Sequence, residues 1–235
     1  MKPEQLVKQL TSESLLKLKS VILYGSAAAG DHTGKRSDYN ILVITEQLNL
    51  PELKILNKPT RAWVRAGNPP PLLFTIERLK KSADVFPIEL LDMKESHVVL
   101  FGEDVLEHVQ VSTENLRLEL EHELKGKLIQ LRERFLTTQT RPRAIADLLI
   151  NSLSTFLVLF RAALRLFQDN IPAKKMEALK ALSIHIQCDP VVFETVQSIK
   201  EGREKIRGHD IIDLYDRYLR GVENVVDAVD KYIHE

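Results

Sequence analysis

Apolar residues in the first 110 positions come in short runs, which polar or turn-forming residues separate. A short apolar run bounded by turn residues predicts a strand that is covered on both faces. Five runs are predicted to be strands: 21–24, 41–44, 72–75, 86–93 and 97–101. Because helical patterns lie between these runs, the first part of the chain is predicted to be an α/β or α+β domain.

The helices of this part are expected at 3–20, from Pro51 to Ala66, and at 76–83. Proline is compatible with the first turn of a helix, so Pro51 marks the start of the second one. Pro59 lies in the middle of the same stretch and is predicted to break it, which leaves a second piece ending at Ala66.

The pattern changes after Ser112, where apolar residues recur every three or four positions. This spacing places them on one side of a long helix: Leu116, Leu120, Leu124, Leu128, Leu131 and Phe135. Prolines at 142, 172 and 190 mark further helix starts. Four or five helices on short connections predict an antiparallel bundle. The chain is therefore expected to form two domains, 1–110 and 111–235.

Composition narrows the classes of function that fit the chain. Hydrophobic residues make up 44% of the 235 positions, enough for a real core. The formal net charge is zero, so general nucleic-acid binding through a basic face is not expected. The single cysteine excludes an intramolecular disulfide and a cysteine-rich zinc site.

The same features favour a cytoplasmic protein. The N-terminus opens as an amphipathic helix and not as a signal peptide. Polar residues interrupt the most apolar stretch, Leu148–Leu164, which is therefore expected to be a buried helix and not a membrane span.

The candidate chemistry lies between the first two predicted strands. The connection begins with Gly25 and Ser26, passes Gly30, and ends with Asp38 and Asn40. Glycine lets the backbone turn tightly and approach a ligand, and a serine hydroxyl with its backbone N–H suits phosphate oxygens. Residues two apart on a strand share a face, so Asp38 and Asn40 are expected to point the same way.

This arrangement resembles the DNA polymerase β-type nucleotidyltransferase superfamily, which includes the aminoglycoside nucleotidyltransferases. The family pattern is Gly-Ser, a few residues, Gly, and an Asp-x-Asp pair on the next strand. The resemblance implies an α+β fold, with a mixed sheet and helices followed by an antiparallel helical bundle. It also implies an NTP substrate, Mg²⁺, and an acceptor pocket in the bundle.

The remaining site residues follow from the same resemblance. A third acid of the family lies on a later strand, and Glu89 in the predicted strand 86–93 is the expected counterpart. Asp38 and Glu89 would then hold the metal. Lys35 and Arg36 precede the aspartate and could meet the triphosphate, or could equally be exposed loop charges.

One residue departs from the pattern, because Asn40 stands where the family has its second aspartate. A unit charge at metal-ligand range is worth about 4 kcal/mol at an effective dielectric near 20, so its loss weakens metal binding strongly. Three interpretations stay open. The chain is a Mg²⁺-dependent enzyme that transfers a nucleoside monophosphate to an unknown hydroxyl acceptor, a degenerate relative that acts as a nucleotide-binding or protein-interaction module, or a scaffold. A homo-oligomer or a protein partner is left open as well.

Overall fold

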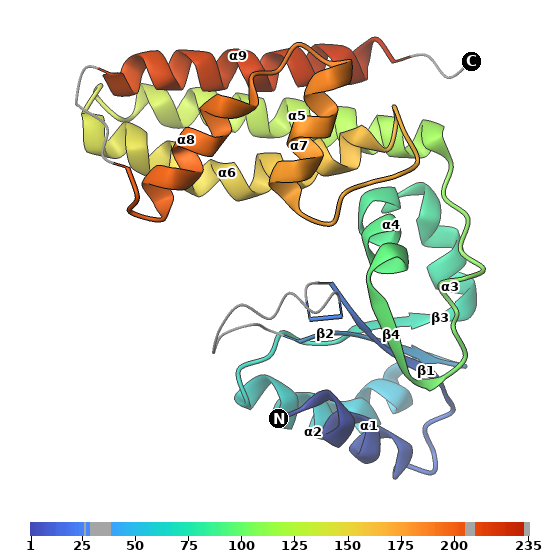
Figure 1. Ribbon diagram of the computed structural model, residues 1–235. Helices are drawn as coiled ribbons and strands as arrows, with labels where there is room; N and C mark the ends of the chain where they lie inside the picture. The colour runs from blue at the N-terminus through green and yellow to red at the C-terminus, as the bar shows by residue number, and fades with distance from the viewer. Residues whose placement is uncertain (26, 29–38, 205–209, 233–235) are drawn as a thin grey trace. The chain divides into compact units, whose positions relative to one another are not determined.

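The computed structural model describes residues 1–25, 27–28, 39–204 and 210–232. The chain forms two compact units, Met1–Ser112 and Thr113–Glu235 (Figure 1). The first contains a sheet with helices on both faces, and the second is helical. The structure confirms the α+β class, with a mixed sheet followed by a helical region.

The sheet of the N-terminal unit has four strands in the described part of the chain, in the order β3-β2-β1-β4. The strands are β1 (Leu18–Tyr24), β2 (Asn40–Thr45), β3 (Leu72–Thr75) and β4 (His97–Gly102). The central strand β1 pairs antiparallel with both β2 and β4, whereas β3 pairs parallel with β2. The predicted strands at 21–24, 41–44, 72–75 and 97–101 are thus confirmed.

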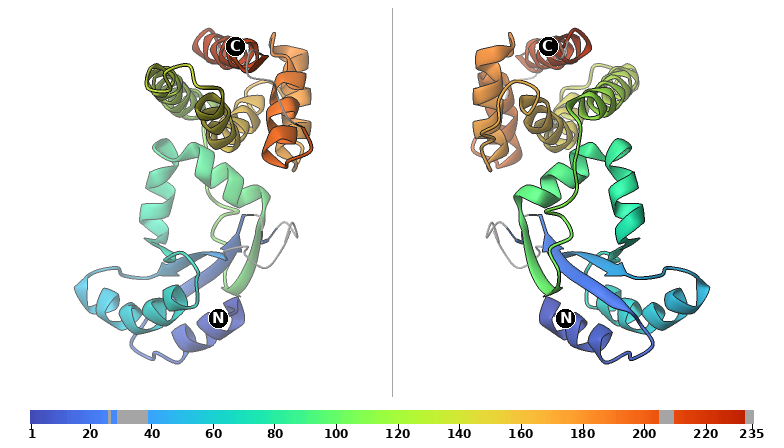
Figure 2. Two further views of the ribbon diagram at one scale, coloured as in Figure 1. Left: turned by 90° about the vertical axis from the view of Figure 1, so that its left-hand side faces the viewer. Right: turned by 90° about the vertical axis from the view of Figure 1, so that its right-hand side faces the viewer.

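Each face of the sheet has its own core, because successive strand residues point to opposite sides. On one face, Val21 and Leu23 pack with α1 (Pro3–Thr11) and α2 (Leu50–Arg65). Ile22 faces the other side, with α3 (Ile76–Lys81), the short 3-10 helix η1 (Ser82–Asp84) and α4 (Pro87–Glu95). The helices form two layers, one on each face of the sheet (Figure 2).

The predicted break at Pro59 is wrong, because α2 runs unbroken from Leu50 to Arg65. Leu56, Pro59 and Trp63 form the buried stripe of this helix. Proline inside a helix costs roughly 3 kcal/mol, but most helical stability in proteins comes from packing of the apolar face. The first helix is also shorter than expected, since α1 ends at Thr11 and β1 already begins at Leu18.

The predicted strand 86–93 is wrong as well, because α4 occupies this stretch. Pro87 lies at the first turn, and the carbonyl of Phe86 accepts the N–H of Leu90 at 3.1 Å. Ile88, Leu90 and Met93 are buried on the helix. A short apolar run fits a buried strand or a buried helix equally well, and the proline start was the signal that favoured the helix.

The helices of the C-terminal unit are α5 (Thr113–Leu136), α6 (Pro142–Leu164), α7 (Lys175–His185), α8 (Pro190–Lys200) and α9 (Asp210–Asp230). The central helix α6 contacts each of the other four (Figure 2). By length and composition, α6 would also be long and apolar enough to cross a membrane. Its contacts with four helices of the same unit account for that apolarity.

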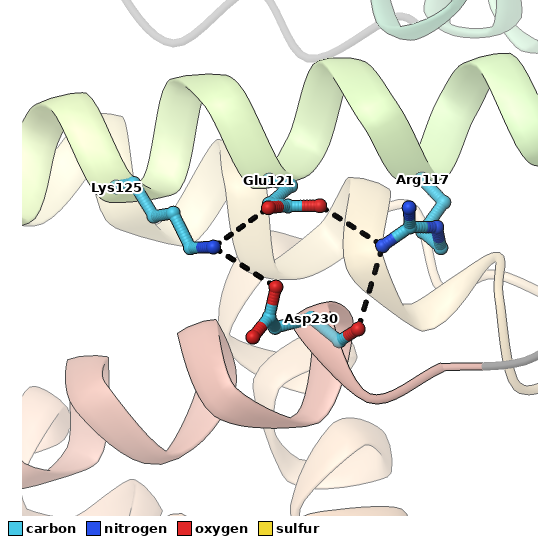
Figure 3. Close-up of polar contacts among 4 residues, drawn as sticks. All are labelled: Arg117, Glu121, Lys125 and Asp230. Carbon is cyan, nitrogen blue, oxygen red and sulfur yellow. Dashed lines mark hydrogen bonds and ion pairs between the residues drawn. The ribbon is translucent and has the colours of Figure 1, made fainter.

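Ion pairs join α9 to α5 (Figure 3). Lys125 lies 2.6 Å from Glu121 and 2.9 Å from Asp230, and Arg117 donates to Glu121 at 2.9 Å and to the Asp230 carbonyl at 3.4 Å. The hydrogen bond from Lys125 lowers the pKa of the Asp230 carboxyl. Because the start of α5 thus meets the end of α9, the two helices run antiparallel.

Candidate functional site

One end of the sheet brings the candidate site residues together. Tyr24 pairs with Asn40 on one side and with His97 on the other. Directly opposed residues of neighbouring strands share a face, so these three side chains form a row. The same face carries Ile22 and Leu42 one step further along the strands, among the core residues that pack against α4.

Gly25 begins the connection that follows β1, directly beside this row. Its φ is +79°, in the left-handed region that favours glycine. Its N–H donates to the Ser96 carbonyl at 2.9 Å, and its carbonyl accepts the N–H of Ala28 at 2.9 Å. A Cβ at this position would lie 3.3 Å from the Asn40 Nδ2 atom. The Asn40 amide therefore faces the start of the turn at close range.

Buried polar contacts fix the start of β2. The Asn68 side chain is nearly fully buried, and its Oδ1 accepts the N–H of Tyr39 at 3.4 Å. Its Nδ2 donates to the Met1 carbonyl at 3.3 Å, and Trp63 Nε1 donates to the Pro69 carbonyl at 2.8 Å. These bonds hold the residue before Asn40, a role that the sequence pattern did not indicate.

Four of the predicted site residues lie outside the described residues: Ser26, Lys35, Arg36 and Asp38. The phosphate contacts expected of Ser26, Lys35 and Arg36, and the metal contact expected of Asp38, stay predictions. Gly25 and Asn40 are described, and the structure places them against each other.

Glu89 was predicted to lie on a strand, and the structure places it on a helix. The residue occupies the first turn of α4 and is exposed, and it is not on a strand. None of the four strands of the described sheet contains an aspartate or a glutamate. The strand position that the expected metal role of Glu89 assumed is therefore wrong, and the shared metal site with Asp38 stays a prediction.

Tyr24 and His97 are the residues of this row that the sequence pattern did not indicate, and His97 has the more extensive polar contacts. Its Nε2 atom lies 2.9 Å from Asp104 Oδ2, and its Nδ1 atom lies 3.1 Å from the Lys94 carbonyl oxygen. Both ring nitrogens thus face oxygen atoms, and these contacts hold the ring at the start of β4. In the sequence, His97 has no metal-ligand companion at useful spacing. The signal that could have identified it as a site residue is its position at the start of the predicted strand 97–101.

The contact with His97 also affects the pKa of the Asp104 carboxyl. Partial burial raises the pKa of this carboxyl, but the hydrogen bond and charge of His97 outweigh it. The N–H of Leu106, 3.1 Å from Asp104 Oδ1, lowers the pKa further, and the net result lies below the ordinary value. Tyr24 differs, since burial raises the pKa of its phenol and keeps it protonated.

The described donors do not fit a two-metal centre. Mg²⁺ is held by carboxylates and phosphates in octahedral oxygen sites, whereas this row offers an amide, a phenol and an imidazole. Within the described ranges, no group of three His, Cys, Asp or Glu side chains could hold a metal ion. The row ends in His97, whose ring lies 2.9 Å from an Asp104 carboxylate oxygen.

The fold and the turn at Gly25 define a class: the chain has an aminoglycoside nucleotidyltransferase-like fold. Spectinomycin adenyltransferase AAD(9) from Enterococcus faecialis, crystallised with ATP and spectinomycin, matches with a TM-score of 0.55 and 15% identity. That match covers 97% of this chain and 98% of the adenyltransferase. At this identity, the likeness establishes the fold and not the activity.

A toxin–antitoxin structure with AMP-PNP gives a weaker match, with a TM-score of 0.35 and 17% identity. It covers 56% of this chain and 99% of the other. No protein-family model matches the sequence, and no curated protein matches it either.

Proposed function

We propose that this protein binds a nucleoside triphosphate at the turn after β1 and that it does not transfer the nucleotide efficiently. The observation that carries the proposal is the row Asn40–Tyr24–His97, which contains no carboxylate at the place where the fold class holds its metals. The molecule is thus nucleotidyltransferase-like in fold, and its metal site is degenerate.

Nucleotide binding is supported by the turn itself. Gly25 adopts the left-handed conformation that allows a close backbone approach, and Ser26 would supply a hydroxyl and an N–H to phosphate oxygens. The adenyltransferase of the same fold was crystallised with ATP.

Inefficient transfer follows from the missing charges. Two-metal phosphoryl transfer needs closely spaced carboxylates to hold the cations that stabilise the attacking and leaving oxygens. Asn40 offers a neutral oxygen, and Glu89 is exposed on α4. Asp38 would remain as the acid of the motif, which is insufficient for a metal pair.

Catalytic transfer is the alternative. The adenyltransferase was crystallised with ATP and spectinomycin, and its chain is matched over 98% of its length. In that case Mg²⁺ would be required and the C-terminal unit would contribute to an acceptor pocket. The acceptor, the preferred base, a protein or second-copy partner and the cytoplasmic location stay predictions.

Thermal unfolding with each NTP, with and without Mg²⁺, tests the proposal. Ligand at about 100 times its dissociation constant stabilises the folded state by ~2.7 kcal/mol, a readily visible shift. We expect a shift in wild type that does not depend on Mg²⁺ and that disappears in Ser26→Ala. Asn40→Asp should restore a Mg²⁺-dependent increment by returning the missing charge.

Asn57→Asp is the matched control, because Asn57 is exposed on α2 and undergoes the same charge change. It should bind as wild type does. A Mg²⁺-dependent shift in wild type, together with release of pyrophosphate on addition of an acceptor, would overturn the proposal in favour of the enzyme. The absence of any shift in wild type and in Asn40→Asp would overturn nucleotide binding itself.

A further inference from the structure

A groove lies between α5 and α6 of the C-terminal unit, with a volume of about 170 Å³. Its rim residues recur at three- or four-residue spacing on each helix, so each helix contributes a single face. The polar residues of the rim are Lys127, Gln130 and Arg134 on α5, and Asn151, Ser152 and Thr155 on α6.

The floor of the groove is apolar and well packed. Leu131, Leu148 and Phe156 line it and are buried. Ser152 joins floor to rim, since its hydroxyl lies 3.1 Å from the hydroxyl of the fully buried Tyr218 and donates to the Leu149 carbonyl. The groove is therefore a surface depression whose polar groups lie above buried, apolar residues of α5 and α6.

The charged residues of the rim are all positive. Lys127 and Arg134 are cations, and no lining residue is acidic. Within the described ranges, the Arg134 guanidinium has no ion-pair partner, and Lys127 approaches Glu123 only at 3.9 Å.

Other bases of the same helix are paired far more closely, as Lys125 with Glu121 at 2.6 Å and Arg132 with Glu223 at 2.7 Å. The bases of α5 that face away from the groove thus have carboxylate partners, whereas those that face the groove lack a close one.

We propose that this groove binds a small molecule that carries an oxyanion, with a phosphate ester of a small polyol as the best fit. A guanidinium recognises phosphate or carboxylate oxygens with two parallel hydrogen bonds, and the Lys127 ammonium adds charge. The amides of Gln130 and Asn151 and the Thr155 hydroxyl would bind hydroxyls of the ligand. The volume is below the 300–1,000 Å³ or so of drug-sized pockets, so the ligand is small. This inference does not rest on the proposed nucleotide site.

Calorimetric titration of the full chain with glycerol 3-phosphate tests the groove. We expect binding in wild type, weakened roughly tenfold or more in Arg134→Gln, since hydrogen bonds to charged groups are worth about 1.5–3 kcal/mol. Lys127→Gln should weaken it as well. Both side chains are at the surface, so the variants should fold, and circular dichroism checks this.

The controls separate this site from diffuse charge and from the nucleotide site. Arg143→Gln removes an exposed arginine of α6 outside the groove and should change affinity less than about twofold. Ser26→Ala should leave it unchanged. Glycerate and glycerol distinguish the ligand class: binding of glycerate that needs Arg134 supports a carboxylate ligand, and glycerol alone should not bind. Failure of both anionic probes to bind, or equal loss in Arg143→Gln or Ser26→Ala, would overturn the inference.

Discussion

Asn40 and His97 flank Tyr24 in the row of side chains at one end of the sheet. Asn40 has the shape of an aspartate without its charge, and His97 ends the same row with its ring bonded to Asp104. The described row therefore offers an amide, a phenol and an imidazole, and no carboxylate.

Cys188 gives a prediction at the residue scale. Burial, and secondarily the neighbouring Asp189 carboxylate, raise the pKa of the Cys188 thiol to about 12. A raised pKa keeps the reactive thiolate scarce at neutral and mildly alkaline pH. We expect iodoacetamide at pH 8 to alkylate the native protein roughly a hundredfold or more slowly than the urea-unfolded chain.

Mass spectrometry measures this difference without ambiguity, because the chain has one cysteine. If the native rate came within tenfold of the unfolded rate, the thiol would be more accessible than its 6% exposure indicates.

At the scale of elements, the end of β4 depends on one glycine. Gly102 has a φ of +77°, and a Cβ there would lie 1.9 Å from the carbonyl oxygen of Lys19 on β1. The backbone of two paired strands cannot move apart without losing their hydrogen bonds. Gly102→Ala should therefore destabilise the N-terminal unit by roughly 3 kcal/mol or more, as measured by urea unfolding followed through Trp63 fluorescence.

Gly67→Ala is the matched control for this prediction. Gly67 has a similar φ of +92° but nothing within 4 Å of the added Cβ. Only the backbone strain remains there, about 1–2 kcal/mol. Equal losses in the two variants would show that the contact with Lys19 has no separate effect.

At the scale of the whole molecule, each of the two units encloses buried residues of its own. The single tryptophan, Trp63, is fully buried in the N-terminal unit, whereas long helices dominate the other unit. Domains with separate cores commonly unfold as separate units. We expect the urea transition reported by Trp63 fluorescence to differ from that reported by circular dichroism at 222 nm.

Gly102→Ala sharpens this prediction. The substitution should shift the transition seen by Trp63 fluorescence to a lower urea concentration. The main transition seen by circular dichroism at 222 nm should stay at the same urea concentration. Coincident transitions that move together in the variant would instead mean that the two units unfold as one.

The sequence by itself determined the strands around Gly25 and Asn40, the long helices after Ser112 and the class of fold. These follow from local causes: apolar periodicity, turn residues and a spaced motif. The same local patterns mispredicted 86–93 and Pro59, because a short apolar run does not reveal its period and a helix that packs well tolerates a proline.

Only the tertiary structure decided which residues meet. The pairing of β4 with β1 puts His97 in the row of Asn40, and the helical start at Pro87 places Glu89 on a helix instead of the predicted strand. The packing of α5 on α6 likewise creates the groove beside Arg134. Such contacts join positions that are distant along the chain, and they depend on strand order and helix packing, which no local pattern encodes.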